Sequence, residues 1–159
     1  MSAEALTTSM EKLHKLHKSL YELAVKKTDM IKTGDMDALN QMLKDEQAHI
    51  AAIGKMEQER QRICQDLVPD LPSPSLSDCL SMLSEEDKHP LNGLKGQLSV
   101  LIQELKERNQ LNQRLIYQSL QFVNMSMSLV QPQQNQSLNY VHPQANKIKH
   151  PQGMFNSKV

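Results

Sequence analysis

The chain has 159 residues with 18 basic and 18 acidic side chains, ten Met, two Phe and no Trp, a composition typical of long helices rather than sheets. Its net charge of zero leaves no basic surface of the size that nucleic-acid binding requires. No charged-then-apolar leader opens the chain and no apolar run approaches about 18 residues, so we expect a cytoplasmic protein that does not enter the membrane.

The first predicted helix spans residues 3–33. Its apolar residues recur at alternating spacings of four and three, which places them along one face of a helix. The positions on that face are Leu6, Met10, Leu13, His17, Leu20, Ala24 and Ile31. Gly34 then supplies a helix stop, and Asp35 can cap the next helix by accepting its free N–H groups. So short a connection predicts an antiparallel hairpin with a second helix over residues 36–67.

The second predicted helix has a less uniform face. Its expected apolar positions are Leu39, Leu43, Ile50, Ile53, Ile63 and Cys64. Glu46, Glu57 and Arg60 fall close to them, and a partly polar face of this kind weakens packing but sets the register between helices. Cys64 and the later Cys79 lack the spacing of a metal site and the density of a secreted disulfide scaffold, so we expect two reduced, partly buried thiols.

A proline-rich segment separates this hairpin from the rest of the chain. Each proline removes a backbone donor and restricts the residue before it, which ends the second helix. The prolines are Pro69, Pro72 and Pro74. Ser75 and Asp78 then have the spacing of a capping box, which predicts a short helix over residues 76–83.

The last predicted helix, over residues 90–130, is the longest. Pro90 suits its first turn, and Ser-Glu-Glu-Asp at 84–87 is another start signal. One stripe comprises Leu91, Leu94, Leu98, Leu101 and Leu105 and, after Arg108 and Asn112, Leu115, Ser119, Phe122, Ser126 and Leu129. A second stripe beside it comprises Ile102, Asn109, Ile116, Leu120, Val123 and Met127. A helix of about 40 residues is roughly 60 Å long. No other helix can cover it all, so we expect part of its apolar surface to be free for a partner.

These elements predict an all-α fold, namely an elongated antiparallel helical hairpin plus a third long helix in a coiled-coil-like three-helix bundle over residues 1–130. After Val130 the composition turns to Gln, Asn, Pro and His, with isolated apolar residues. Residues 131–159 are therefore predicted to form a flexible, disordered tail. The tail is either a spacer or a short recognition segment, for which Leu138 and Tyr140 are the candidate anchors.

No catalytic motif and no phosphate-binding loop is present in the sequence, and no cofactor is expected. Glu11 with His14 and Glu46 with His49 form two Glu-x-x-His pairs on helices that should pack antiparallel, a spacing used by di-iron bundles. Such bundles take a further Glu from each of two more helices, whereas only three long helices are predicted here, and Glu11, His14 and His49 fall on the flanks of the predicted faces. We therefore expect neither a metal nor an enzyme.

Asn109 and Asn112 lie three residues apart in the middle of the long apolar helix. They form either a polar layer that sets the register, because a buried amide must find hydrogen bonds, or a direct contact with a partner.

The long helix resembles the FlgN family of flagellar export chaperones. The resemblance rests on Asn-x-x-Asn at 109–112 followed by Leu115-Ile116, and on Ser-Leu-Gln-Phe at 119–122. Upstream, Leu-Tyr-Glu-Leu-Ala at 20–24, the Gly34-Asp35 turn with Leu39, and the stretch 46–60 are similar to the first hairpin of the family. The match covers roughly residues 6–130.

This resemblance implies a cytoplasmic chaperone of type III secretion, which binds flagellar hook-associated proteins and escorts them to the export gate at the inner membrane. Cargo would bind near the end of the long helix. The candidate partner-binding residues are Asn109, Asn112, Leu115, Ile116, Leu120, Phe122, Val123, Met127 and Leu129. In related tails a Leu-Tyr pair followed by Gly and basic residues is associated with docking on the export gate. Leu138-Asn139-Tyr140 is its nearest counterpart, with an inserted Asn and no following Gly.

The surplus apolar stripe also permits a second interpretation. In this alternative the protein is a self-associating coiled-coil scaffold, and the stripe pairs with a second copy of itself to form a homodimer.

Overall fold

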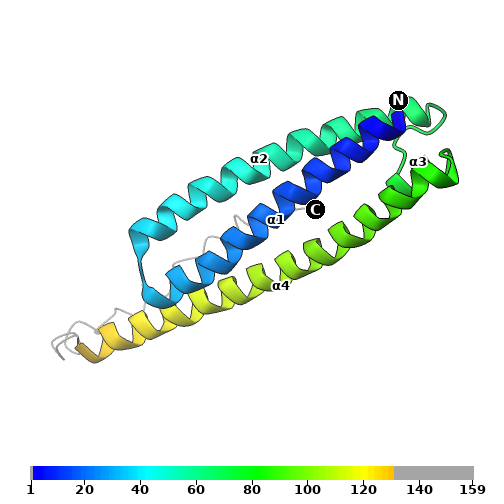
Figure 1. Cartoon of the computed structure of the whole chain (residues 1–159). Coiled ribbons are helices and arrows are strands. Elements are labelled where there is room, and N and C mark those ends of the chain that lie inside the picture. Colours follow the sequence, from blue (N-terminus) through cyan, green and yellow to red (C-terminus); the bar gives the residue numbers. More distant parts are fainter. Residues whose placement is uncertain (1, 131–159) are drawn as a thin grey trace, which may run out of the picture. The chain divides into compact units, whose positions relative to one another are not determined.

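The computed structural model describes residues 2–130, and the regular structure of these residues is entirely helical. The elements are α1 (Ser2–Thr33), α2 (Met36–Leu67), α3 (Leu76–Ser81) and α4 (Glu85–Val130) (Figure 1). The all-α prediction is confirmed. The predicted tail, with Leu138 and Tyr140, lies outside the described residues. None of the described helices is both long and apolar enough to cross a membrane. Residues 1–120 form one compact unit, and the packing below is that of this unit.

The connection between α1 and α2 forms as its sequence predicts. Gly34 adopts a φ of +71°, which a glycine tolerates without strain, and its N–H donates to the Met30 carbonyl oxygen at 3.0 Å. Asp35 caps α2 by accepting a hydrogen bond from the Ala38 N–H at 3.1 Å. The chain therefore reverses within two residues, and α1 and α2 pack antiparallel as a hairpin (Figure 1).

The face of α2 that enters the bundle differs from the predicted one. Leu43 and Ile50, expected to be buried, are 41% and 59% exposed, whereas Met42 is buried. The observed face comprises Leu39, Met42, Glu46, His49, Ile53, Met56, Arg60, Ile63 and Leu67, all buried or half-buried. It keeps the three–four alternation throughout, and its three polar side chains find hydrogen-bond partners within the chain. These partners permit polar residues on a face that hydropathy alone would not select.

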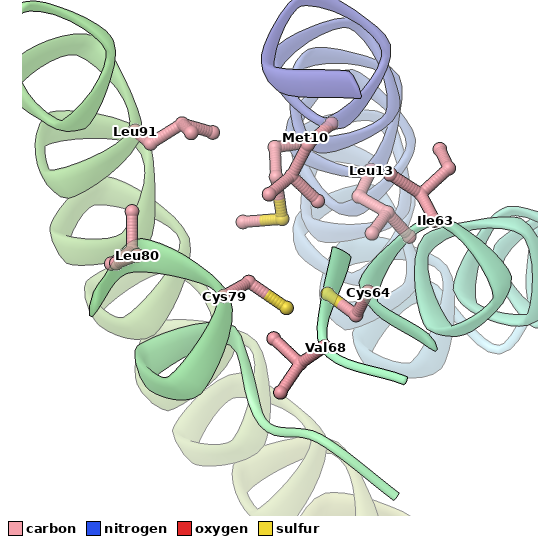
Figure 2. Packing of buried hydrophobic residues seen from close by; sticks show 9 residues of the cluster. Met10, Leu13, Ile63, Cys64, Val68, Cys79, Leu80 and Leu91 are labelled. Atoms are coloured by element: carbon pink, nitrogen blue, oxygen red, sulfur yellow. The ribbon is translucent and has the colours of Figure 1, made fainter. Parts of the chain in front are cut away.

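One end of the bundle holds the main apolar core, to which all four helices or their flanks contribute (Figure 2). Its buried members are Leu6, Met10, Leu13, Ile63, Cys64, Val68, Cys79, Leu80 and Leu91. Cys64 and Cys79 are free thiols, as expected, and both are fully buried. Figure 2 shows their sulfur atoms pointing toward each other. The short helix α3 thus closes the end of the hairpin.

A capping box holds α3 in place, as its sequence predicts. The Asp78 N–H donates to Ser75 Oγ at 3.2 Å, and the Ser75 N–H donates to Asp78 Oδ2 at 2.8 Å. Hydrogen bonds from the Ser75 side chain and backbone lower the pKa of Asp78, which keeps the cap charged. The helix ends at Ser81 rather than at 83, because Met82 and Leu83 continue only with i→i−3 hydrogen bonds.

The long helix begins at Glu85, earlier than the predicted start at Pro90. Ser84 provides the cap, since its Oγ accepts from the Asp87 N–H at 3.3 Å and its carbonyl oxygen accepts from the Lys88 N–H at 2.9 Å. Three acidic residues in the first turn complement the helix dipole. Pro90 lies inside the helix, although a proline there removes one helical hydrogen bond and its ring crowds the carbonyl of residue 86.

Helix α4 packs along α1 in the same direction. Leu91 shares the main core with Leu6, and Leu105 shares a second buried cluster with Leu20 and Ala24. Residue numbers therefore rise together along the two helices, so α1 and α4 are parallel and α2 is antiparallel to both. Figure 1 draws α1 between α2 and α4.

A buried polar layer fixes the register between α1 and α4. The Asn112 amide donates through Nδ2 to the Ala24 carbonyl oxygen at 2.9 Å and accepts through Oδ1 from Thr28 Oγ1 at 2.6 Å. Thr28 and Asn112 are both buried. The amide thus satisfies its hydrogen bonds inside the chain, which favours the register-setting interpretation for Asn112. Asn109, in contrast, is exposed.

We predict that Asn112→Ala destabilises the fold by about 1–3 kcal/mol, because it removes two buried hydrogen bonds and leaves a small cavity. Asn109→Ala is the matched control, with the same change one turn away on an exposed position, and it should shift stability by no more than about 0.5 kcal/mol. Urea unfolding followed by circular dichroism measures both. Equal stability of the two variants would contradict a structural role for Asn112.

Burial raises the pKa of the Cys79 thiol from 9.0 to about 12, and the hydrogen bond with Cys64 adds to this. The unfolded chain loses the Cys79 proton at lower pH than the folded chain does. The contribution of this thiol to stability is therefore complete below about pH 9 and is lost as the pH rises toward about 12. We predict that Cys79→Ala destabilises the protein less at about pH 10 than at neutral pH. An equal loss at both pH values, measured by urea unfolding, would contradict the shifted pKa.

Candidate functional site

The C-terminal third of α4 carries large apolar side chains that no described part of the chain covers. Five of these, which we call the α4 stripe, are between 50% and 81% exposed. They are Leu120, Phe122, Val123, Met127 and Leu129. Leu120, Val123 and Met127 share one face of the helix, and Phe122 and Leu129 share another. Large exposed side chains concentrated in this way mark an interaction site more often than a scattered surface Leu does.

The structure separates the nine predicted partner-binding residues into three groups. The five residues of the α4 stripe are exposed, as is Asn109. Leu115 and Ile116 are half-buried. Asn112 is buried and hydrogen-bonded to α1, so it is not accessible to a partner in this conformation. The accessible candidates therefore begin at Asn109 and continue toward the end of α4.

The end of α4 is uncharged as well as apolar. Residues 115–130 contain no Asp, Glu, Lys or Arg, and Arg114 is the last charged residue before them. Ser119 and Ser128 donate hydrogen bonds to carbonyl oxygens one turn earlier in the helix, at 2.8 Å and 3.0 Å, so these hydroxyls need no partner. Recognition on this surface must therefore rest on apolar contact and on amide or hydroxyl groups rather than on ion pairs.

The structure also reveals a second exposed apolar stripe on α2, which includes Leu43 and Ile50, the two residues that the sequence assigned to the core. Met36, Leu43 and Ile50 recur every seven residues and are between 41% and 63% exposed. Polar and small residues fall between them at the three–four spacing. The full set, which we call the α2 stripe, is Met36, Asn40, Leu43, Gln47, Ile50 and Gly54, all exposed and none charged. The seven-residue period could have shown this second face, but hydropathy placed Leu43 and Ile50 on the buried one.

A groove runs between α2 and α4 beside this stripe, with a volume of about 250 Å³. We call it the α2–α4 groove. Its lining residues are Leu20 and Lys27 from α1, Glu46 and Ile50 from α2, and Asn109, Asn112, Gln113 and Ile116 from α4. Lys27 and Glu46 form an ion pair at 3.2 Å within it. Every charge in the groove is therefore neutralised by its neighbour.

Of the two Glu-x-x-His pairs, the second, Glu46 with His49, serves packing between α1 and α2, whereas Glu11 is exposed. Glu46 is paired with Lys27, and His49 is bonded through Nε2 to Ser19 Oγ at 2.8 Å and through Nδ1 to the Asp45 carbonyl oxygen at 2.7 Å. In residues 2–130 no three His, Cys, Asp or Glu side chains come together as metal ligands would. The histidines of the two pairs, His14 and His49, are both half-buried.

Comparison with known proteins places these observations in a family. The model of the family described as FlgN protein matches residues 1–147. The uncharacterized protein YvyG of Bacillus subtilis is 29% identical over 164 residues, which covers the whole of both chains. No solved structure matches the chain.

We predict that the α4 stripe contributes little to folding. Phe122→Gln should change the free energy of unfolding by no more than about 0.5 kcal/mol, because the side chain is exposed. Leu105→Gln on the same helix should cost about 2–4 kcal/mol, because it places an amide in the second buried cluster. Thermal and urea unfolding compare the two. A large loss from Phe122→Gln would show that the stripe belongs to the fold.

Proposed function

We propose that the cargo of this chain, which belongs to the FlgN family of flagellar export chaperones, is a flagellar hook-associated protein. The cargo would bind along residues 115–130 of α4. The family comprises chaperones, not enzymes. The bound element would be an amphipathic terminal helix of the cargo, and the complex would form in the cytoplasm before export.

The observation that carries this proposal is the uncovered α4 stripe. A large apolar side chain contributes about 1.5–3 kcal/mol when it is transferred fully from water into an interface. Leu120, Val123 and Met127 lie on one face of α4 and Phe122 and Leu129 on another, so cargo must contact both faces to use all five anchors. Burial of the five side chains would then exceed the roughly 8 kcal/mol that corresponds to micromolar affinity, and ordering of the partners consumes the difference. Affinity in this range suits a chaperone, because it must hold its cargo and later release it.

The physical role of such a complex is to prevent premature assembly. A cargo helix whose apolar face is free would associate with its own kind, and a helix packed against the α4 stripe cannot. Delivery to the flagellar export gate at the inner membrane would follow, with the chaperone docked on the gate rather than inserted in the membrane. We propose Leu138 and Tyr140, both beyond the described residues, for that contact.

The exposed stripe also favours a second candidate function, in which the protein is a self-associating scaffold. Two copies could cover each other's α4 stripe, since each offers an uncharged apolar helix. The two functions differ in what covers the stripe, so the mass of the free chain and its binding of cargo separate them.

We predict that the chain and its cognate hook-associated protein, purified from the same organism, form a complex that elutes as one species in gel filtration. The double variant Phe122→Gln/Val123→Gln should weaken binding at least about tenfold, because it removes two central anchors. Val100→Gln, an equally apolar and exposed position earlier on α4, is the matched control and should bind as the unaltered chain does.

Unaltered binding by the double variant would disprove the assignment of the cargo site. If the chain binds no hook-associated protein and sedimentation shows a mass that rises with concentration and falls in the double variant, the scaffold function is the correct one.

A further inference from the structure

We propose that the cargo helix also occupies the α2–α4 groove, where it lies against the α2 stripe as a fourth helix of the bundle. This inference deepens the proposed function and rests on it. It assigns a role in binding to Leu43 and Ile50 on α2, which are remote in sequence from residues 115–130.

The first argument is that α2 has two helix-packing faces. The face that contacts the bundle and the α2 stripe both follow the three–four alternation, and they lie about a quarter turn apart on the helix. A helix with two adjacent faces of this kind has a neighbour on each in helical bundles. Contacts with α1 cover the first face, whereas the side chains of the α2 stripe are exposed.

The second argument is that α4 presents a matching wall across the groove. Asn109, Gln113 and Ile116 line the groove on the α4 side, and Ile50 lines it on the α2 side. The wall continues at helical spacing to Ile102 in one direction and Leu120 in the other, and both are exposed. From residue 102 to 120, and likewise from 36 to 54, each wall is about 27 Å long. A single helix of roughly 18 residues would fill this length.

The third argument concerns the chemistry of the occupant. The α2 stripe and the groove-lining residues of α4 offer apolar, amide and small side chains, and Lys27 and Glu46 neutralise each other. A charged partner would lose its hydration in the groove without gaining a counter-ion, whereas an uncharged amphipathic helix would lose little. The volume of about 250 Å³ is smaller than a typical small-molecule site but sufficient for anchoring side chains of a helix.

The fourth argument is continuity with the proposed cargo site. Ile116 and Leu120 belong both to the wall of the groove and to residues 115–130. A cargo helix that contacts Ile116 and Leu120 therefore already lies at the edge of the groove. This continuity is why we assign the groove to cargo rather than to an unrelated ligand.

The test uses the full chain and the cognate hook-associated protein, with binding measured by isothermal titration calorimetry. Leu43→Asp/Ile50→Asp should weaken binding at least about tenfold, because each change buries an unpaired charge under the cargo helix. Ala48→Asp is the matched control. This variant introduces the same charge at an exposed position. Ala48 lies two residues from Ile50 and therefore on the opposite side of α2, so the substitution should leave the affinity within about twofold.

Circular dichroism and urea unfolding establish that each variant is folded. If the aspartate pair does not fold, Leu43→Gln/Ile50→Gln replaces it, with an expected loss of about fivefold or more. Unchanged affinity of the α2 variants, together with loss of binding in Phe122→Gln/Val123→Gln, would overturn this inference and leave the proposed function intact. Failure of the unaltered chain to bind cargo would overturn both. A drop in the mass of the free chain on Leu43→Asp/Ile50→Asp would assign the groove to a second copy instead and overturn the inference.

Discussion

The register of α4 against the α1–α2 hairpin depends on the hydrogen bonds that Asn112 makes across to α1. Leucines repeat along α4 at nearly constant intervals, and apolar contact alone would tolerate a shift of one heptad between α1 and α4. The buried amide does not tolerate it, because a shift would separate the amide from the Ala24 carbonyl oxygen and from Thr28 Oγ1. One polar contact therefore decides which residues of α4 are covered and which remain accessible.

Exposed apolar surface of this extent promotes aggregation in most proteins, whereas a chaperone uses such surface to bind its cargo. The covered part of α4 packs on α1, and the end of the same helix presents uncharged apolar side chains to solvent. The fold keeps these roles apart, since the main core around Cys64 and Cys79 lies at the end of the bundle where α4 begins. Substitutions that alter the binding surface can therefore leave the core undisturbed.

Much of the fold follows from local features of the sequence. The buried face of α1, the Gly34–Asp35 turn and the capping box at Ser75 are each decided by residues within a few positions of one another, and the sequence predicts all three. The predicted start of α4 at Pro90 was wrong because two local start signals compete there. The Ser84 cap with its acidic first turn outweighs Pro90, so the helix begins at Glu85.

The errors that matter for the site have a non-local origin. Hydropathy assigns Leu43 and Ile50 to the core of α2, but the polar residues that actually face α1 do so because Ser19 and Lys27 are there to receive them. The difference between Asn109 and Asn112 likewise depends on the parallel direction of α1 and α4, which the sequence of α4 alone does not contain. The position of a buried polar residue depends on its hydrogen-bond or ion-pair partner, and here that partner is distant in the sequence.

The sequence separation of these contacts also sets the order in which the helices associate during folding. The hydrogen bonds of Asn112 join residues 84 and 88 positions apart, whereas the hairpin contact between Ser19 and His49 spans 30. Closing the longer loop loses more chain entropy before any contact compensates, so we expect α1 and α2 to associate first and α4 to join them later. On the ribosome the hairpin is complete while most of α4 is still to be synthesised. Each nascent chain therefore exposes the side of the α1–α2 hairpin that borders the α2–α4 groove before α4 has been synthesised.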